Sequence, residues 1–112
     1  MKLITAIIQP FMLTKVMHQL ESVKGFPGMT VTDVRGFGRE KLQHRHRPGE
    51  EATDFVKKVR IDIAAPDTLS TEIVNVLVGA AHTGNEGDGK LFVCTLEDAV
   101  RIKTGETADA AL

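Results

Sequence analysis

The first half of the chain changes its hydrophobic period twice, from strand to helix and back to strand. Residues 3–9, LITAIIQ, are rich in β-branched side chains and predict a strand that Pro10 closes. Apolar side chains then recur every three or four residues from 13 to 20, the spacing of an amphipathic helix. The run GFPG ends this helix, and residues 29–38, MTVTDVRGFG, predict a second strand. The apolar helix positions are Leu13, Val16, Met17 and Leu20.

The second half repeats this order. In residues 57–65, KKVRIDIAA, apolar and charged side chains alternate as in a half-buried strand. Pro66 and Asp67 open a second helix. Residues 90–96, KLFVCTL, are apolar on both faces and predict a central strand, and the alternation at 100–103, VRIK, predicts a short final strand. The apolar face of the helix comprises Leu69, Ile73, Val76, Leu77 and Ala80.

Two strand–helix–strand units of similar length predict a ferredoxin-like fold of the α+β class, with the order βαββαβ. The chain has 112 residues, which favours a single domain over 1–112. The four strands would form an antiparallel sheet with both helices on one face. The other face would then lack a cover, which favours an oligomer.

Residues 39–54, REKLQHRHRPGEEATD, show neither a helical nor a strand period. Structureless loops longer than about 12–15 residues are uncommon in compact domains and are usually functional or disordered. We therefore expect the contact with a partner protein in this segment.

Composition excludes several classes of protein. The net charge of −1 and the absence of Trp and Tyr argue against nucleic-acid binding, and no apolar run is long enough to insert into a membrane. The single Cys94 excludes an internal disulfide and fits a reducing cytoplasm. Because it lies in an apolar run, we expect Cys94 to be buried.

The glycine-rich run TGNEGDGKLF, at 83–92, suggests phosphate chemistry. Gly84 to Lys90 spell G-x-x-x-x-G-K, but Lys90 precedes Leu91 and a strand. A P-loop needs Ser or Thr after the lysine and a helix facing the phosphates, so a P-loop hydrolase is disfavoured. Two interpretations remain: an anion-binding nest of backbone N–H groups beside Lys90, or a plain turn after a helix.

Further basic groups support the first interpretation. Arg101 and Lys103 would project from the same face of a strand, and GFGR at 36–39 adds two glycines and an arginine. If these elements converge, they suffice to hold a polyphosphate. The alternative is that Arg101 and Lys103 form an ordinary solvated strand face.

At this point the sequence resembles a known family, the PII signal-transduction proteins, which are nitrogen regulators of bacteria, archaea and plants. The resemblance implies a homotrimer that binds ATP or ADP in clefts between subunits and contacts partners through a "T-loop", here about residues 38–55. It spans nearly the whole chain. The segments that carry it are AIIQPF at 6–11, GMTVTDVRGFGR at 28–39, DFVKKVRIDI at 54–63, TGNEGDGKLFV at 83–93 and RIKTGE at 101–106.

The resemblance also implies a nucleotide site built from two subunits. The glycine-rich run and the GFGR turn would hold the phosphates, and Arg101 and Lys103 would reach in from the neighbouring subunit. Gly28, Met29, Thr30, Gly36 and Ala64 would line the adenine and ribose. The implied nucleotide-binding residues are Gly28, Met29, Thr30, Gly36, Phe37, Gly38, Arg39, Ala64, Gly87, Asp88, Gly89, Lys90, Arg101 and Lys103.

The chain departs from the family pattern at its effector site. Family members bind 2-oxoglutarate with Mg²⁺, and Lys58 keeps the residue that pairs with it. Family members usually have Gln at the position that helps to hold Mg²⁺, and this chain has Glu40 there. The carboxylate of Glu40 can hold Mg²⁺ but repels a dicarboxylate. The following glycine is Leu42, and Gln9 replaces a basic residue. These changes argue against 2-oxoglutarate sensing of the usual kind.

The T-loop is also atypical. It has no Tyr for the uridylylation seen in many members and no Ser for phosphorylation. His44 and His46 flank Arg45, and in an extended segment they would point the same way, as metal ligands do. Solvated loop histidines are the other interpretation. His18 and His82 are expected to be structural or solvent-facing.

The sequence therefore predicts a non-enzymatic PII-like signalling protein. It would bind an adenine nucleotide and regulate a transporter, enzyme or transcription regulator through the T-loop, in nitrogen metabolism or transport. Two other functions stay open. One is a metal- or metabolite-responsive regulator of a transporter that uses His44 and His46. The other is a slow ATPase, although no residue resembles a base positioned for attack by water.

Overall fold

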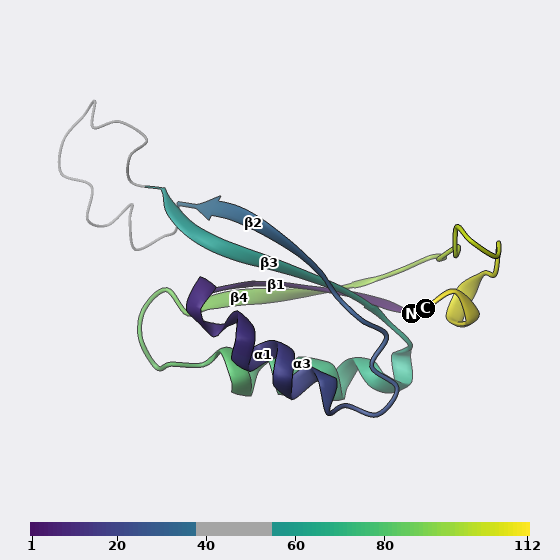
Figure 1. Cartoon of the computed structure of the whole chain (residues 1–112), viewed down its shortest axis with the longest axis horizontal. Coiled ribbons are helices and arrows are strands. Elements are labelled where there is room, and N and C mark those ends of the chain that lie inside the picture. Colours follow the sequence, from purple (N-terminus) through teal and green to yellow (C-terminus); the bar gives the residue numbers. More distant parts are fainter. Residues whose placement is uncertain (38–54) are drawn as a thin grey trace.

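The computed structural model describes residues 1–37 and 55–112. Its strands form one antiparallel sheet in the order β2-β3-β1-β4, and both α-helices pack on the same face of it (Figure 1). This confirms the ferredoxin-like βαββαβ prediction. The elements are β1 (Lys2–Ile8), η1 (Pro10–Met12), α1 (Leu13–Glu21), β2 (Thr30–Gly36), β3 (Val56–Ala65), α3 (Asp67–Ala81), β4 (Gly89–Thr95) and η3 (Ala108–Ala111).

The core lies between the sheet and the helices, and the central strands β1 and β3 supply its floor. Alternate residues of these strands are buried, and register pairs Ile4 with Ile63 and Ala6 with Ile61. Since opposite residues of an antiparallel pair share a face, these side chains all point toward the helices. The predicted alternation of Val59, Ile61 and Ile63 is thereby confirmed.

The helices supply the other half of the core through the predicted apolar positions. Val16 and Leu20 of α1 and Ile73 and Leu77 of α3 are almost completely buried. Helix α3 begins directly after Pro66, and the Asp67 carboxylate in its first turn lies 3.1 Å from the Met1 α-amino group. A negative charge at a helix N-terminus is favourable, so this ion pair fixes the start of α3 beside the start of β1.

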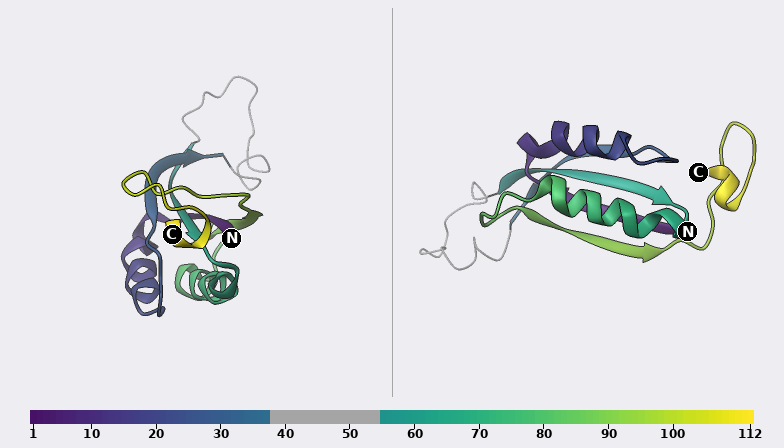
Figure 2. Two further views of the ribbon diagram at one scale, coloured as in Figure 1. Left: turned by 90° about the vertical axis from the view of Figure 1, so that its right-hand side faces the viewer. Right: turned by 90° about the horizontal axis from the view of Figure 1, so that it is seen from below.

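The opposite face of the sheet carries no element among residues 1–37 and 55–112 (Figure 2). It presents polar groups at its centre, where Thr5 donates to Asp62 at 2.7 Å and Arg60 pairs with Asp62 at 3.0 Å. It also presents Phe92, half of whose surface (51%) is exposed. We call this surface the bare face. No helix in the described part of the chain is long and apolar enough to cross a membrane.

Strand β4 differs from its prediction in position. It is an edge strand that pairs only with β1, whereas the apolar pattern of residues 90–96 predicted a central strand. As a consequence Phe92 and Val93, which point to opposite faces, are both about half exposed, and Cys94 is exposed rather than buried. The prediction of a buried Cys94 is wrong because β4 is an edge strand, and no further strand among the described residues covers it.

The predicted final strand at 100–103 is also wrong. Val100 forms only an isolated bridge to Thr107, and the chain between them turns back on itself. The Arg101 N–H donates to the Glu106 carbonyl at 2.8 Å, and the Gly105 N–H donates to the Arg101 carbonyl at 2.7 Å. Gly105 has φ +75°, a conformation that favours glycine. Arg101 and Lys103 therefore lie in a tight turn and not along one strand face.

Gly89→Ala should strongly destabilise the fold, because an added Cβ would lie 1.8 Å from the Ile7 carbonyl oxygen of β1 and because φ is +103°. We expect the free energy of unfolding to fall by about 2 kcal/mol or more. Gly79→Ala is the matched control, since nothing lies within 4 Å of its added Cβ and it sits inside α3. That variant should gain about 0.5–1 kcal/mol. Urea melts of both variants measure the difference, and equal stabilities would contradict the assigned register.

Candidate functional site

The glycine-rich loop connects α3 to β4 at the end of the sheet where β2 ends and β3 begins (Figure 1). Three of its glycines have positive φ: Gly84 at +86°, Gly87 at +84° and Gly89 at +103°. L-residues rarely adopt this backbone conformation, and it turns N–H groups of neighbouring residues toward a common concavity. The positive φ values at these glycines are compatible with an anion-binding nest, which remains a prediction.

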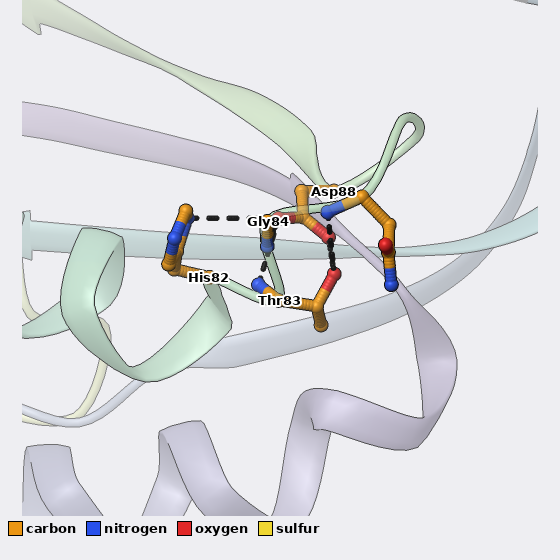
Figure 3. Close-up of polar contacts among 5 residues, drawn as sticks. His82, Thr83, Gly84 and Asp88 are labelled. Carbon is orange, nitrogen blue, oxygen red and sulfur yellow. Dashed lines mark hydrogen bonds and ion pairs between the residues drawn. The ribbon is translucent and has the colours of Figure 1, made fainter.

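The Asp88 carboxylate organises this loop from within (Figure 3). It accepts hydrogen bonds from the Thr83 N–H at 2.7 Å, from the Gly84 N–H at 2.9 Å and from the Thr83 hydroxyl. The imidazole of His82 completes the cluster, with Nδ1 lying 3.7 Å from Asp88 Oδ2. Asp88 is one of the predicted nucleotide-binding residues, but in this structure its oxygens bond to the loop itself.

These contacts change the acidity of Asp88. The hydrogen bonds from the Thr83 side chain and backbone, the Gly84 N–H and the charge of His82 together outweigh the opposing effect of burial and lower the pKa of Asp88. Hydrogen bonds to a carboxylate favour its charged form. Asp88 therefore remains ionised at neutral pH and holds the loop as an anion.

Lys58 joins the loop to the sheet. Its ammonium group donates a hydrogen bond to the Gly87 carbonyl, and its aliphatic stem lies beside Gly36 at the end of β2. Gly87 also lies close to the Gln9 amide, which would be 3.2 Å from a Cβ at that position. The structure thus brings Gly36, Lys58 and Gly87 of the predicted site together, with Gln9 as a further neighbour.

Lys90 stands at the start of β4 on the bare face. It pairs in register with Ile7 and is exposed. Phe37, which follows β2, packs against Phe55 with ring centroids 5.7 Å apart. We call the resulting set of predicted residues at this end of the sheet the loop-end group; it comprises Gly36, Phe37, Lys58, Gly87, Asp88, Gly89 and Lys90.

The remaining predicted residues lie at the other end of the sheet, and we call them the terminal-end group. Thr30 begins β2 and Ala64 lies one residue from the end of β3, while Arg101 and Lys103 follow β4 (Figure 1). The Arg101 guanidinium donates to the Leu112 carbonyl at 2.9 Å. The group comprises Gly28, Met29, Thr30, Ala64, Arg101 and Lys103.

The two groups do not meet within one chain. Lys58 and Ala64 are six residues apart on β3, which corresponds to about 20 Å at a rise of about 3.3 Å per residue. Gly36, which was predicted to line the adenine with Gly28 and Thr30, lies in the loop-end group instead.

A groove of about 330 Å³ also borders the loop, between α3 and β4 on the helix side of the sheet.

Comparison with known proteins decides the family. A family profile described as "Nitrogen regulatory protein P-II" matches residues 1–106. The chain belongs to the PII nitrogen regulatory family. "Nitrogen regulatory protein GlnK" and "Nitrogen regulatory protein P-II 1" of Escherichia coli (strain K12) are each 46% identical to this chain, and each match covers 100% of both proteins.

A solved structure shows the same fold. The crystal structure of Arabidopsis thaliana PII bound to citrate matches with a TM-score of 0.81 and 33% sequence identity, covering 99% of this chain and 91% of that one. PII proteins are signal transducers that regulate partner proteins and are not enzymes. The predicted family, fold class and absence of enzymatic function are therefore confirmed, and the slow-ATPase alternative is removed.

Five predicted residues of this PII protein lie outside the described residues. They are Gly38, Arg39, Glu40, His44 and His46. Within 1–37 and 55–112, no cluster of three or more His, Cys, Asp or Glu side chains could hold a metal ion. The metal prediction for His44 and His46 therefore remains a prediction.

Sequence reasoning gave no role in this site to two residues beside the loop-end group. Thr83 and His82 border the Asp88 carboxylate, while Gln9, which the sequence placed at the effector site, borders Gly87. Thr83 could have been found from its own sequence signal, since Thr readily hydrogen-bonds to nearby backbone and side chains in turns. His82 lies only six residues before Asp88, but no local pattern shows that the loop folds back to bring the two side chains together.

Asp88→Asn should destabilise the protein at pH 7, because an amide accepts fewer and weaker hydrogen bonds than a carboxylate. The folded-state pKa of Asp88 is lowered, so its stabilising effect is present above the ordinary pKa of about 3.9 and is lost as pH falls through the folded-state value. Urea melts at pH 7 should therefore give a lower free energy of unfolding for Asp88→Asn than for wild type. This difference in free energy should become smaller in melts below about pH 3.9.

The control for this prediction is Glu86→Gln in the same loop, where Glu86 has no hydrogen bond or ion pair to any described residue. Glu86→Gln should leave the melts close to those of wild type at both pH values. A gap between wild type and Asp88→Asn that does not change with pH would show that the negative charge of Asp88 is not what holds the loop.

Proposed function

We propose that this PII protein forms a homotrimer and binds ATP or ADP in the clefts between its subunits. It regulates a partner protein through the T-loop, about residues 38–55. The observation that carries the proposal is the division of the implied nucleotide-binding residues between two ends of one sheet. Each group is half of a site, and a second copy of the chain supplies the other half.

The loop-end group has the chemistry of a phosphate site. Three left-handed glycines shape a loop whose backbone N–H groups can face an anion, and two ammonium groups, on Lys58 and Lys90, add positive charge. Asp88 acts as part of the frame, since its carboxylate is occupied by Thr83 and Gly84. A phosphate bound by this loop would therefore contact backbone and lysine and not the Asp88 oxygens.

The terminal-end group has the complementary chemistry. Arg101 and Lys103 carry positive charges on an exposed turn, and Gly28, with φ +101°, leaves open space beside Thr30. A guanidinium group binds phosphate oxygens in a bidentate manner, so Arg101 suits the outer phosphates. Arg101 follows β4 and lies at the far end of the sheet from Lys90. The loop-end group and the terminal-end group of one chain therefore cannot both contact one nucleotide.

The bare face supports a symmetric assembly. An antiparallel sheet commonly packs one face on the core, and a second face that exposes Phe92 is a candidate for contact between copies. The edge strand β4 exposes apolar side chains on both faces, which points the same way. Packing of bare faces around a three-fold axis would cover Phe92 and bring the loop-end group of one chain to the terminal-end group of the next.

Lys58 is the side chain that we assign to a carboxylate effector. In this structure its ammonium group donates to the Gly87 carbonyl. A carboxylate effector at Lys58 would have to replace this bond, which would link the effector to the phosphate loop. The Arabidopsis thaliana relative was crystallised with citrate, a carboxylate ligand. The Glu40 carboxylate, as the sequence predicts, would help to hold Mg²⁺ at this site.

The output is regulation of a transporter, enzyme or transcription regulator in nitrogen metabolism, within the cytoplasm. ATP and ADP would favour different arrangements of the loop base if they bind those arrangements with different affinity. The loop base is where Gly36 and Val56 pair at the ends of β2 and β3, next to Lys58 and Gly87. Nucleotide and partner therefore meet at one end of the sheet.

A mixture of two variants that each bind nucleotide weakly tests whether two chains share one nucleotide site. Lys90→Ala and Arg101→Ala should each lower ATP and ADP affinity by about tenfold or more, because each loses a charged hydrogen-bond donor to phosphate. After the two variants are unfolded together and refolded, some clefts pair the intact Lys90 of one chain with the intact Arg101 of the next. Isothermal titration should then recover a fraction of tight sites.

The control is each variant refolded alone, which should recover no tight sites. Tight binding that never returns in the mixture would place Lys90 and Arg101 in the same half-site and contradict a cleft between subunits. Wild-type protein that binds neither ATP nor ADP would refute nucleotide binding altogether.

Phe92→Glu should disrupt the assembly, because it buries a charge in the proposed contact between bare faces. Sedimentation velocity should show a trimer for wild type and smaller species for Phe92→Glu. Phe11→Glu is the matched control: Phe11 precedes α1 and is 72% exposed, yet it lies outside the strands that form the bare face. Trimers for all three proteins would exclude the bare face as the contact surface.

A further inference from the structure

His82 is the one imidazole that contacts the phosphate loop among the described residues. It directly follows α3, and its Nδ1 atom lies 3.7 Å from Asp88 Oδ2 (Figure 3). Its other ring nitrogen lies near Gly84, 3.8 Å from the position of an added Cβ. The side chain is 70% exposed, so it exchanges protons freely with solvent.

Among the described residues, the charged group that contacts His82 is the Asp88 carboxylate of the loop. Lys90 of β4 also borders the groove, but its side chain lies on the bare face, on the other side of the sheet. The segments of β1 and α3 that line this groove contribute only apolar residues. Carboxyl and ammonium groups ordinarily titrate near about 3.9 and 10.4, whereas imidazole titrates near about 6.5. An imidazole is therefore the kind of side chain whose charge can change between about pH 5.5 and 8, whereas carboxyl and ammonium groups keep theirs.

We propose that His82 is a positioning residue that makes the phosphate loop, and through it the affinity for phosphate-bearing ligands, respond to pH. The protonated imidazole attracts the Asp88 carboxylate, which in turn holds the N–H groups of Thr83 and Gly84. With the imidazole protonated, the frame of the loop has an ion pair that is absent when the imidazole is neutral. The ligand part of this inference rests on the nucleotide binding proposed above.

The expected effect on affinity is modest and has a definite sign. The ion pair is largely exposed, and exposed pairs typically change an equilibrium constant by no more than about fivefold. The imidazolium also adds one positive charge to the loop, which acts in the same direction on an anionic ligand. ADP should consequently bind about two- to fivefold tighter at pH 6 than at pH 8, relative to a variant without the imidazole.

The free protein provides the first test, and it requires no ligand. The backbone amide resonances of Thr83 and Gly84 in ¹H–¹⁵N spectra should shift between pH 5.5 and 8 in wild type. In His82→Gln they should stay constant over this range. His18→Gln is the control, since His18 lies on α1 and contacts Glu21 instead; its Thr83 and Gly84 resonances should follow the wild type. Constant resonances in wild type, or equal shifts in His82→Gln, would overturn the proposal.

The second test uses ADP. Isothermal titration at pH 6 and pH 8 yields an affinity ratio for wild type and another for His82→Gln. Protonation of the ADP phosphates affects both proteins equally and cancels when the two ratios are compared. A wild-type ratio about two- to fivefold larger than that of the variant supports the inference, and equal ratios refute its ligand part.

The two tests separate this inference from the proposed function. If the amide resonances shift with pH but wild type binds no ADP at either pH, nucleotide binding fails and the His82 response of the loop stands. If ADP binds equally well and the resonances do not shift, nucleotide binding stands and the His82 inference fails.

Discussion

The alternation of side chains along β1 and β3 is the constraint from which the rest of this structure follows. One set, including Ile4, Ile61 and Ile63, is completely buried under the helices. Because register pairs these residues with each other, the intervening residues must share the opposite face. A slip of one residue would expose the whole core set, so the register is held strongly. That register in turn decides which functional side chains reach the bare face.

The same constraint positions the glycine-rich loop between α3 and β4. The β1–β4 ladder places Gly89 opposite Ile8, close enough to the Ile7 carbonyl that only glycine fits. The loop must therefore enter β4 through a left-handed glycine, and the Asp88 carboxylate one residue earlier folds back onto Thr83 and Gly84. Loop geometry is thus fixed from both sides, by the sheet and by a charged hydrogen-bond cluster. A loop held this way needs little reorganisation to accept an anion, which is the physical meaning of preorganisation.

The sequence predicted the elements well where a period spans many residues. The helix from 13 to 20 and the strand from 57 to 65 bury the faces that their patterns indicate. The predictions were wrong where the position of a segment depends on which other strands and turns lie beside it in the fold. The apolar run at 90–96 has the composition of a central strand, yet β4 is an edge strand in a single chain. Four alternating residues at 100–103 are too few to identify a strand, and the turn at Gly105 prevails.

The candidate site shows the same limit. The glycines and Lys90 could be proposed as site residues because their chemistry is local and their spacing is distinctive. The hydrogen bonds of the Asp88 carboxylate within the loop were not predicted, since an amino-acid sequence does not show which way a side chain points. The same applies to the bond from Lys58 to the Gly87 carbonyl, which joins segments 29 residues apart. Both depend on how the ends of the sheet come together.

The separation of the two half-sites has a thermodynamic consequence for the proposed function. If each nucleotide contacts the loop-end group of one chain and the terminal-end group of another, the ligand binds the assembly and not the isolated chain. Mass action then requires that nucleotide stabilise the assembly and that assembly raise nucleotide affinity by the same free energy. Within the described residues, about 20 Å of β3 separates Lys58 from Ala64, so one chain would not bring both groups to the same nucleotide. Sensing and oligomerisation are on this view one equilibrium, and the geometry of a single sheet is what couples them.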